Sequence, residues 1–330
     1  MPQESVFCIG IDIGGTKISL GVFDSNGTLY GQIQNIPVPF DERRVADPNR
    51  MINLITPFIE EAKEHYSPLI GIGLSICGNV NKQTGEAVLT PNLHWSHMPF
   101  GAMVREAFNL PVFAGTDVRA AALAERLWGV AKHTRFFAWC TVGTGYGGYF
   151  FLDGKLYDGF HGFAGPFGHI IWDEEGYPCG CGGRGCFETF VAGPAIARAG
   201  QAAVDAGQSP LMASLSHGSR VTTHIVIQAY YQNDPAAVAI IEKVARLIAI
   251  NLSGLVNALD LEMIVLGGGV IQACPELIDR IDHHIRKYLM SDEARRDLRL
   301  ERETFVNSAL YGAAADVFAR SGIICEILGA

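Results

Sequence analysis

Basic residues are few in this chain. Its 330 residues include 25 Lys and Arg against 34 Asp and Glu, which gives a formal net charge of −9. Surfaces that bind nucleic acid concentrate Lys and Arg, so we expect no nucleic-acid partner. Charged residues make up 18% of the chain and hydrophobic residues 48%, which is enough apolar material for a large core spread over two domains.

Long apolar segments are also missing. No run of about 18 uncharged apolar residues occurs, so the sequence predicts no membrane span. The segment 1–5 has neither a basic region nor an apolar run, and it is unlike a secretory signal. We therefore expect a cytoplasmic protein.

The eight cysteines do not have the pattern of a disulfide framework. Three of them cluster near residue 180, and the others are scattered in mostly apolar contexts that are typical of buried, reduced thiols. The scattered thiols are Cys8, Cys77, Cys140, Cys274 and Cys325. Reduced thiols agree with a cytoplasmic location.

The clustered cysteines form the most informative motif of the chain. Cys179, Cys181 and Cys186 lie within eight residues, and His169 precedes the first of them by ten positions. Three thiolates and one imidazole are a complete tetrahedral ligand set for Zn²⁺, and a closed set of four predicts a structural ion. The glycines around the cysteines let the short loop bend toward one ion. The alternative is a glycine-rich loop whose cysteines are incidental.

One supersecondary unit occurs twice. Each copy consists of a strand, a turn rich in Gly and Thr, a second strand and an Asn-Gly or Asp-Gly hairpin turn. In the first copy these parts are residues 6–11, 12–16, 18–23 and 26–27, and in the second they are 136–142, 143–148, 149–152 and 153–154. Two copies of one unit predict a duplicated domain.

Helical patterns occupy the intervening segments. Apolar residues at helical spacing predict helices at 117–129, 234–259 and 309–319, and an Asp-Pro pair opens the second of these. A predicted strand at 263–266 leads into three glycines. The charge run 292–303 predicts a solvated helix face. Strands that alternate with helices indicate the α/β class.

The first glycine turn has the composition of a phosphate site. A strand delivers Asp12 to its carboxyl end, and Gly14, Gly15 and Thr16 follow. Bare backbone N–H groups and a hydroxyl can donate to phosphate oxygens, and an acid beside them suits Mg²⁺ that keeps part of its water. No helix follows, so the turn is neither a dinucleotide fingerprint nor a Walker loop. Lys17 could neutralise phosphate or face solvent, and a structural hairpin turn is the alternative.

The second turn supplies the same kind of donors from the second copy, through Gly143, Thr144 and Gly145. Two phosphate cradles that face one cleft would hold a nucleoside triphosphate. The three glycines after the strand at 263–266, which are Gly267, Gly268 and Gly269, could let an adenine lie against bare backbone. A tight strand-to-helix turn would have the same composition.

Together these motifs resemble the ROK family of bacterial sugar kinases and repressors. The resemblance extends over nearly the whole chain and rests on residues 12–17, 91–95, 117–125, 143–145, 165–169, 179–188 and 266–269. It implies the duplicated actin/hexokinase-like (ribonuclease H-like) α/β fold, with a central cleft between two domains. We expect a small lobe of residues 1–117 plus about 310–330, and a larger lobe of residues 118–309 that contains the zinc loop 169–186.

The resemblance also implies the chemistry. Asp117 would be the general base that accepts the proton of a sugar hydroxyl as its oxygen attacks ATP, although it could also cap the helix that begins there. Mg²⁺ and a structural Zn²⁺ would be the metals, and the assembly would be a homodimer. His169 would give one ring nitrogen to zinc and the other to sugar. The implied sugar-binding residues are Gly78, Asn92, Thr116, His169 and Glu188.

Two positions depart from the family pattern. Pro166 stands where the family usually has a glutamate, and Thr116 stands where it usually has an asparagine. Both changes concern the expected sugar pocket. The sequence thus predicts an ATP:sugar phosphotransferase that acts at O6 of a free hexose or N-acetylhexosamine. The alternatives are a sugar-responsive transcriptional regulator, which in this family carries a helix-turn-helix domain before the phosphate motif, and a catalytically impaired sugar-binding protein.

Overall fold

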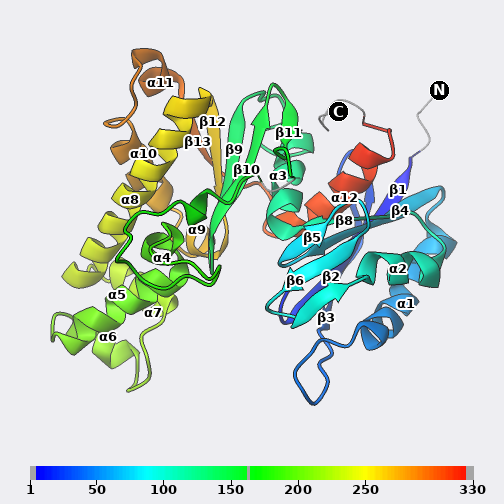
Figure 1. Cartoon of the computed structure of the whole chain (residues 1–330), viewed down its shortest axis with the longest axis horizontal. Coiled ribbons are helices and arrows are strands. Elements are labelled where there is room, and N and C mark those ends of the chain that lie inside the picture. Colours follow the sequence, from blue (N-terminus) through cyan, green and yellow to red (C-terminus); the bar gives the residue numbers. More distant parts are fainter. Residues whose placement is uncertain (1–4, 162–163, 325–330) are drawn as a thin grey trace. The chain divides into compact units, whose positions relative to one another are not determined.

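The structure is a computed structural model that describes residues 5–161 and 164–324 (Figure 1). Cys325 and most of the segment 1–5 lie outside these ranges. The chain divides into two compact units, the first made of residues 1–133, 154–156 and 304–330 and the second of residues 134–153 and 157–303. The expected boundary lay at residue 117, whereas this division assigns the following helix to the first unit.

The sheet of the first unit begins with the predicted hairpin. β1 and β2 are antiparallel, and β4 and β8 continue the sheet parallel to β1. The strand order is β3-β2-β1-β4-β8. The bounds are β1 Phe7–Ile13, β2 Lys17–Asp24, β3 Leu29–Pro37, β4 Leu69–Ile76 and β8 Val112–Thr116. The two strands expected at 6–11 and 18–23 are therefore confirmed, each with small differences at its ends.

β1 is apolar except for Asp12 near its end, because both faces of the strand are covered. Ile9, Ile11 and Ile13 belong to a core with α1 (Pro48–His65) and α2 (Phe100–Phe108), whereas Cys8 faces α12 (Ser308–Arg320). Successive side chains of a strand point to opposite faces, so this alternation follows from the extended backbone. The arrangement directs the carboxyl end of β1 toward the unit's candidate site.

α12 packs very closely on the sheet and on α3 (Asp117–Leu127), as its red ribbon shows in Figure 1. A Cβ at Gly73 of β4 would lie 1.8 Å from the carbonyl oxygen of Ala313, so only glycine fits there. A buried ion pair of 2.9 Å joins Arg119 of α3 to Asp316 of α12. Small residues and this ion pair hold α3 in place, and α3 begins at the predicted base.

A small antiparallel sheet completes the first unit. Its order is β5-β6-β7, with bounds β5 Asn79–Asn81, β6 Glu86–Thr90 and β7 Trp95–Met98. Trp95 is buried, and its indole N–H donates to the carbonyl oxygen of Ala46 at 2.7 Å. This sheet carries the segment with Asn92 in the loop between β6 and β7.

The second sheet repeats the plan of the first. An antiparallel hairpin is followed by parallel strands in the order β11-β10-β9-β12-β13. The bounds are β9 Phe137–Val142, β10 Tyr146–Leu152, β11 Lys155–Tyr157, β12 Met263–Gly267 and β13 Arg299–Arg302. The equal strand order confirms the duplicated α/β fold that the two glycine hairpins predicted.

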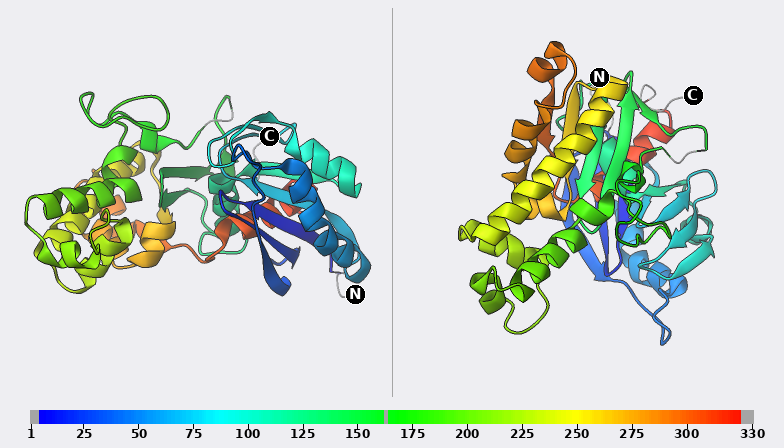
Figure 2. Two further views of the ribbon diagram at one scale, coloured as in Figure 1. Left: turned by 90° about the horizontal axis from the view of Figure 1, so that it is seen from below. Right: turned by 60° about the vertical axis from the view of Figure 1, so that its left-hand side comes forward.

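Helices cover the second sheet. The long helix α8 (Pro235–Leu259) packs its apolar stripe on the core of the sheet and is yellow in Figure 2. Asp234 caps it by accepting the backbone N–H of Ala237, as its sequence position predicted. The other elements are η1 Phe167–His169, α4 Glu188–Val191, α5 Gly193–Asp205, α6 Pro210–Leu215, α7 Thr223–Tyr231, α9 Gly269–Ala273, α10 Leu277–Ile285 and α11 Asp292–Asp297.

Two expectations for this unit need correction. The strand expected at 149–152 already begins at Tyr146, because glycines in an extended ladder do not interrupt it. The charge run 292–303 is not one solvated helix: it forms α11 and β13, and its last residue, Glu303, is buried. Charge alone did not reveal that Glu303 accepts backbone and side-chain N–H groups inside the unit.

Within the described ranges, no helix combines the length and the apolar composition needed to cross a membrane.

Candidate active site

The carboxyl ends of three parallel strands meet in the first unit. Asp12 of β1 pairs in register with Ser75 of β4, and Ser75 pairs with Gly115 of β8. The Ser75 hydroxyl donates to the Asp12 carboxylate at 2.7 Å. Side chains that follow parallel strands lie at one edge of the sheet. The sheet therefore brings Asp12 close to the residue that follows β8, which is Asp117.

Asp117 is the first residue of α3, but it is not the helix cap. Thr116 is the cap, because its hydroxyl accepts the backbone N–H of Arg119 at 3.2 Å. Thr116 thus has a local structural role, and the carboxylate of Asp117 is not needed for that role. One Asp117 oxygen accepts the N–H of Val118 at 2.9 Å.

The charge of Asp12 influences the ionisation of Asp117. Burial, and to a smaller degree the nearby charge of Asp12, together raise the pKa of Asp117 to about 6. The pKa of Asp12 is also raised by burial, although the Ser75 hydroxyl and the charge of Lys17 oppose this. Asp117 is therefore ionised at neutral pH and is more basic than an ordinary aspartate.

The glycine turn between β1 and β2 is tight. The N–H of Gly14 donates to the carbonyl oxygen of Lys17 at 3.0 Å, and Thr16 and Lys17 are exposed. Asn92 lies against the turn, because a Cβ at Gly15 would be 2.9 Å from the Cβ of Asn92. The structure thus assembles the first predicted phosphate turn and one predicted sugar residue within one unit.

Gly78 has a backbone role at the start of the small sheet. Its φ is 127°, and a Cβ there would lie 2.5 Å from the carbonyl oxygen of Leu89. The preceding residue, Cys77, lies near both acids, and burial and the charges of Asp117 and Asp12 raise the pKa of its thiol to about 11. Cys77 therefore stays a thiol at neutral pH.

The second glycine turn has a similar closed shape. The N–H of Gly143 donates to the carbonyl oxygen of Gly145 at 2.9 Å, and the N–H of Gly193 donates to the carbonyl oxygen of Gly143 at 2.7 Å. A Cβ at Gly143 would lie 3.6 Å from the backbone nitrogen of Gly269. Two of the three predicted glycine segments therefore lie side by side in the second unit.

The glycines after β12 form a strand-to-helix turn. Gly268 has a φ of 92°, and a Cβ on it would lie 2.5 Å from the hydroxyl oxygen of Thr141. Its N–H donates to the carboxylate of Glu303 at 3.0 Å, which also leaves no room for a side chain at Gly267. Nothing lies within 4 Å of the Cβ position of Gly269, so the open side of the turn is at this residue.

The four predicted zinc ligands come together. One ligand atom from each of His169, Cys179, Cys181 and Cys186 lies within 4.8 Å of all the others. Cys179 Sγ is 3.6 Å from His169 Nδ1, and Cys181 Sγ is 3.6 Å from Cys186 Sγ. A tetrahedral zinc site with thiolate and imidazole ligands has edges of about 3.5–3.8 Å. The donor set and its spacing therefore fit zinc.

The loop reaches this geometry through its backbone. The N–H of Cys179 donates to the carbonyl oxygen of Gly183 at 2.9 Å, and Gly185 has a φ of 70°. A short bridge pairs Ile171 with Cys186 and returns the chain to the histidine segment. Two residues later Glu188 begins α4. The loop therefore fixes the start of that helix relative to His169.

Pro166 precedes the histidine turn without distorting it. It directly precedes η1 with a φ of −75° and a ψ of 49°, and its carbonyl oxygen accepts the N–H of His169 at 2.9 Å. The proline side chain is exposed and carries no polar atom. An ordinary residue could adopt this φ, so the backbone does not require proline.

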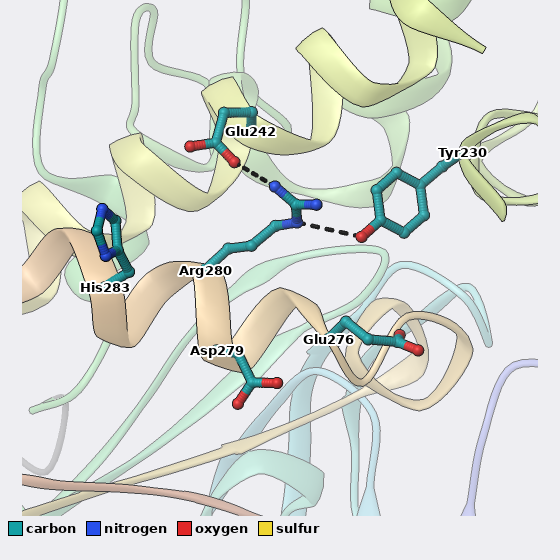
Figure 3. A pocket seen from close by; sticks show the side chains of 6 residues that line it. All are labelled: Tyr230, Glu242, Glu276, Asp279, Arg280 and His283. Carbon is teal, nitrogen blue, oxygen red and sulfur yellow. Dashed lines mark hydrogen bonds and ion pairs between the residues drawn. The ribbon is translucent and has the colours of Figure 1, made fainter. Parts of the chain in front are cut away.

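A pocket of about 390 Å³ lies elsewhere in the second unit and contains none of the predicted residues. Arg280 reaches between Glu242, at 2.6 Å, and the hydroxyl of Tyr230, at 3.1 Å (Figure 3). Its lining residues are Tyr230, Glu242, Glu276, Asp279, Arg280 and His283. Glu242 and Arg280 form an ion pair inside this pocket, which contains none of the residues expected from the motifs.

A family model described as "ROK family" matches residues 8–319. The chain belongs to the ROK family. A glucokinase of Streptomyces coelicolor is 30% identical over 94% of this chain and 96% of its own length. A xylose repressor of Caldicellulosiruptor bescii is 28% identical over 78% of this chain and 65% of its own length.

The solved structure of a ROK family glucokinase from Streptomyces griseus, in complex with glucose and AMPPNP, has the same fold. It is 29% identical, with a TM-score of 0.78, and the match covers 93% of this chain and 98% of that one. The expected ROK membership and the two-domain α/β fold are thereby confirmed. This chain is thus similar to that glucokinase over nearly the whole length of both chains.

Three residues of this ROK protein were missed at the level of sequence. Ser75 lies near the end of β4 and Cys77 directly follows the strand, and their proximity to Asp12 follows only from parallel pairing of β1 with β4. Glu303 lay within a charge run that gave no sign of burial. The pattern of a strand followed by Cys-Gly could have identified the end of β4 as part of the site, since β4 lies between the two strands that deliver acids.

Proposed function

We propose that this protein is an ATP- and Mg²⁺-dependent sugar kinase that phosphorylates O6 of a free hexose or N-acetylhexosamine. The observation that carries the proposal is the pair formed by Asp12 and Asp117 at one edge of the first sheet, with the pKa of Asp117 raised to about 6. A carboxylate with that pKa is ionised at neutral pH and accepts a proton readily. The similarity to glucokinases makes glucose the first candidate substrate.

Asp117 would act as the general base. The O6 oxygen of the sugar attacks the γ-phosphorus of ATP, its proton passes to the Asp117 carboxylate, and the bond from the γ-phosphorus to the bridging oxygen breaks with release of ADP. Because Thr116 caps α3 and Val118 binds one Asp117 oxygen, the other oxygen can accept the proton. The remaining demand of such a reaction is positioning and charge neutralisation.

The phosphates would be held by the two glycine turns. Gly14, Gly15 and Thr16 supply donors in the first unit, with Lys17 beside them, and Gly143, Thr144 and Gly145 supply donors in the second. Asp12 is the carboxylate that would hold Mg²⁺ through its water, and that ion supplies positive charge to the phosphates when bound. Gly269 is the open glycine against which an adenine would lie.

The sugar hydroxyls would be bound by Asn92, Glu188 and the free ring nitrogen of His169, with Thr116 and Gly78 at the edge of the pocket. His169 faces the cysteines through Nδ1, which leaves Nε2 for a sugar oxygen. A structural Zn²⁺ held by the four ligands would fix this histidine and the start of α4. We also propose a homodimer, which light scattering of the purified protein tests directly.

The test is a phosphoryl-transfer screen. Purified protein is incubated with ATP and Mg²⁺ and with glucose, mannose, fructose, N-acetylglucosamine or N-acetylmannosamine, and ADP release is followed. We expect turnover on at least one aldohexose, and turnover at least about a hundredfold lower with Asp117→Asn. Absence of turnover on every sugar, with retained sugar binding by calorimetry, would instead establish the impaired sugar-binding protein that the missing carboxylate at Pro166 suggests.

A further inference from the structure

Segments that carry the predicted zinc ligands contact both backbone polar groups of Tyr146. Its N–H donates to Glu188 Oε2 at 2.8 Å. Its carbonyl oxygen lies against Gly168, where a Cβ would be only 1.8 Å away. Tyr146 is the residue that follows the turn of Gly143 to Gly145, so these contacts fix the exit of that turn.

Both contacting residues are adjacent to the cysteine–histidine cluster. Gly168 directly precedes His169, and Glu188 follows Cys186 by two residues. The second oxygen of Glu188 lies 3.7 Å from the Sγ of Cys179. One carboxylate therefore contacts a ligand of the cluster with one oxygen and the glycine turn with the other.

The aromatic side chain of Tyr146 strengthens the same connection. Its ring packs edge-on against Phe167, with centroids 5.6 Å apart, and at a tilt against Phe187, with centroids 5.2 Å apart. Phe167 belongs to the histidine turn and Phe187 lies between the last cysteine and Glu188. A shift of either segment after loss of the metal would therefore reach Tyr146 through packing as well as through the hydrogen bond.

The position of Glu188 explains why residue 145, the second glycine of the turn, is a glycine. A Cβ at Gly145 would lie 2.7 Å from Glu188 Oε2, whereas one at Gly143 would have no neighbour closer than 3.6 Å. Gly145 does not have a positive φ, so its backbone conformation alone does not require glycine. The requirement comes from the approach of the carboxylate to the turn.

We propose that Glu188 is a positioning residue that couples the cysteine–histidine metal site to the Gly143–Gly145 turn, so that metal binding raises nucleotide affinity. The inference rests on the proposed function only in taking the turn as the nucleotide site. Linkage requires the reverse effect as well: a bound nucleotide retains Zn²⁺ more tightly. A metal that served the sugar pocket alone would leave the nucleotide turn unchanged.

The first test is hydrogen exchange of the Tyr146 amide, measured by mass spectrometry on peptides that cover residues 143–147. Zn²⁺-loaded wild type, chelated wild type, Glu188→Gln and Glu188→Ala are compared without nucleotide. We expect chelation and Glu188→Ala each to accelerate exchange at least about tenfold, because a hydrogen bond to a charged acceptor is lost. Glu188→Gln keeps an acceptor oxygen and should remain close to wild type.

The matched control is Glu262→Ala. Glu262 also accepts backbone amides, from Arg135 at 2.8 Å and Phe136 at 3.0 Å, at the opposite end of β9. The Glu262→Ala substitution should accelerate amide exchange at residues 135–136 and leave exchange at residues 143–147 unchanged. Equal acceleration of the glycine turn in this control would show that general loosening of the sheet, and not Glu188, controls the turn.

The second test is equilibrium binding of a non-hydrolysable ATP analogue, with and without Zn²⁺. Chelation should weaken binding to wild type about tenfold and should add nothing in Glu188→Ala, because coupled changes are not additive. An equal loss of analogue affinity on chelation in wild type and in Glu188→Ala would overturn the proposal. If no form binds the analogue, the proposed kinase function fails, and the exchange experiment still decides whether the metal site controls the turn.

Discussion

The two glycine turns occupy equivalent positions in sheets of the same strand order, yet they are supported differently. In the first sheet the position before the last residue of β1 is Asp12, which pairs with Ser75 of the neighbouring parallel strand. In the second sheet the equivalent position of β9 is Thr141, which pairs with Gly267. The first turn therefore carries an acid in its own strand, and the second does not.

The acid beside the second turn comes from elsewhere in the chain. Glu188 reaches the turn from α4 and accepts the N–H of Tyr146, while Asp12 accepts only a side-chain hydroxyl. Asp12 therefore keeps the capacity to bind a hydrated cation, and Glu188 is used to fix backbone. The two equivalent turns thus differ in their acids: Asp12 lies in the strand that leads into the first turn, and Glu188 binds the backbone that leaves the second.

The largest expected effect is the loss of turnover when the proposed base, which belongs to the first unit, is removed. Asp117→Asn is expected to lower turnover at least about a hundredfold, the low end for loss of a general base. Steady-state kinetics on the best sugar of the screen measure this. Asp205→Asn on the exposed end of α5 is a matched control that should leave turnover unchanged. Turnover within a few fold of wild type in Asp117→Asn would exclude this residue as the base.

The same substitution should stabilise the fold at neutral pH. The folded pKa of Asp117 is raised from 3.8 to about 6, so the folded state binds more protons than the unfolded state between these values. Ionised Asp117 therefore destabilises the protein above pH 6, by at most about 3 kcal/mol for a shift of about two units. Denaturant unfolding should show Asp117→Asn to be more stable at pH 7.5, with the difference lost as the pH falls to about 4.

The two glycines of the second turn should differ in how much stability the protein loses when each is replaced by alanine. Gly145→Ala places a methyl group against Glu188 Oε2 and should destabilise the protein by about 1–3 kcal/mol, whereas Gly143→Ala meets only ordinary contacts. Chemical unfolding measures both. The double variant Gly145→Ala/Glu188→Ala should recover part of the loss, because the methyl group then has room. A double variant that is simply the sum of its parts would argue against the contact.

A gain of affinity is expected at the position that departs from the family pattern. Pro166→Glu adds a charged acceptor for a sugar hydroxyl at a backbone position that any residue can adopt. The KM for aldohexoses should fall about tenfold, since a hydrogen bond to a charged group contributes about 1.5–3 kcal/mol when fully formed. Pro166→Gln tests whether charge or shape matters. A KM that stays constant in both variants would place residue 166 outside the sugar pocket.

The smallest expected effect is the shift in the pKa of Asp117 that the charge of Asp12 causes. The value of kcat/KM should rise with pH to a plateau with a midpoint near 6, because Asp117 must be ionised to accept a proton. Asp12→Asn removes the nearby charge but not the burial, so the midpoint should fall by about one unit or less. If Asp12→Asn is inactive, the pH dependence of its unfolding reports the same shift. A midpoint that does not move would show that the acids do not interact.

The local sequence was sufficient for several elements and for the clustering of the four candidate metal ligands. Short-range patterns determine hairpins, caps and helical stripes, so β1, β2, α8 and α12 appear within a few residues of their expected bounds. The cysteine loop is equally local, because three of its four ligands lie within eight residues and glycines allow only a tight path. Such features depend on neighbours along the chain.

The tertiary structure decided the rest. Asp12, Ser75 and Asp117 become neighbours only because β1, β4 and β8 pair in parallel with one register, and no local pattern contains that register. The raised pKa of Asp117 depends on burial and on the approach of Asp12, both of which arise on folding. Glu188 could be recognised as part of a motif, but its hydrogen bond to Tyr146 joins residues 42 positions apart. Residue types and spacing therefore determined which groups are present, and long-range packing determined which of them act together.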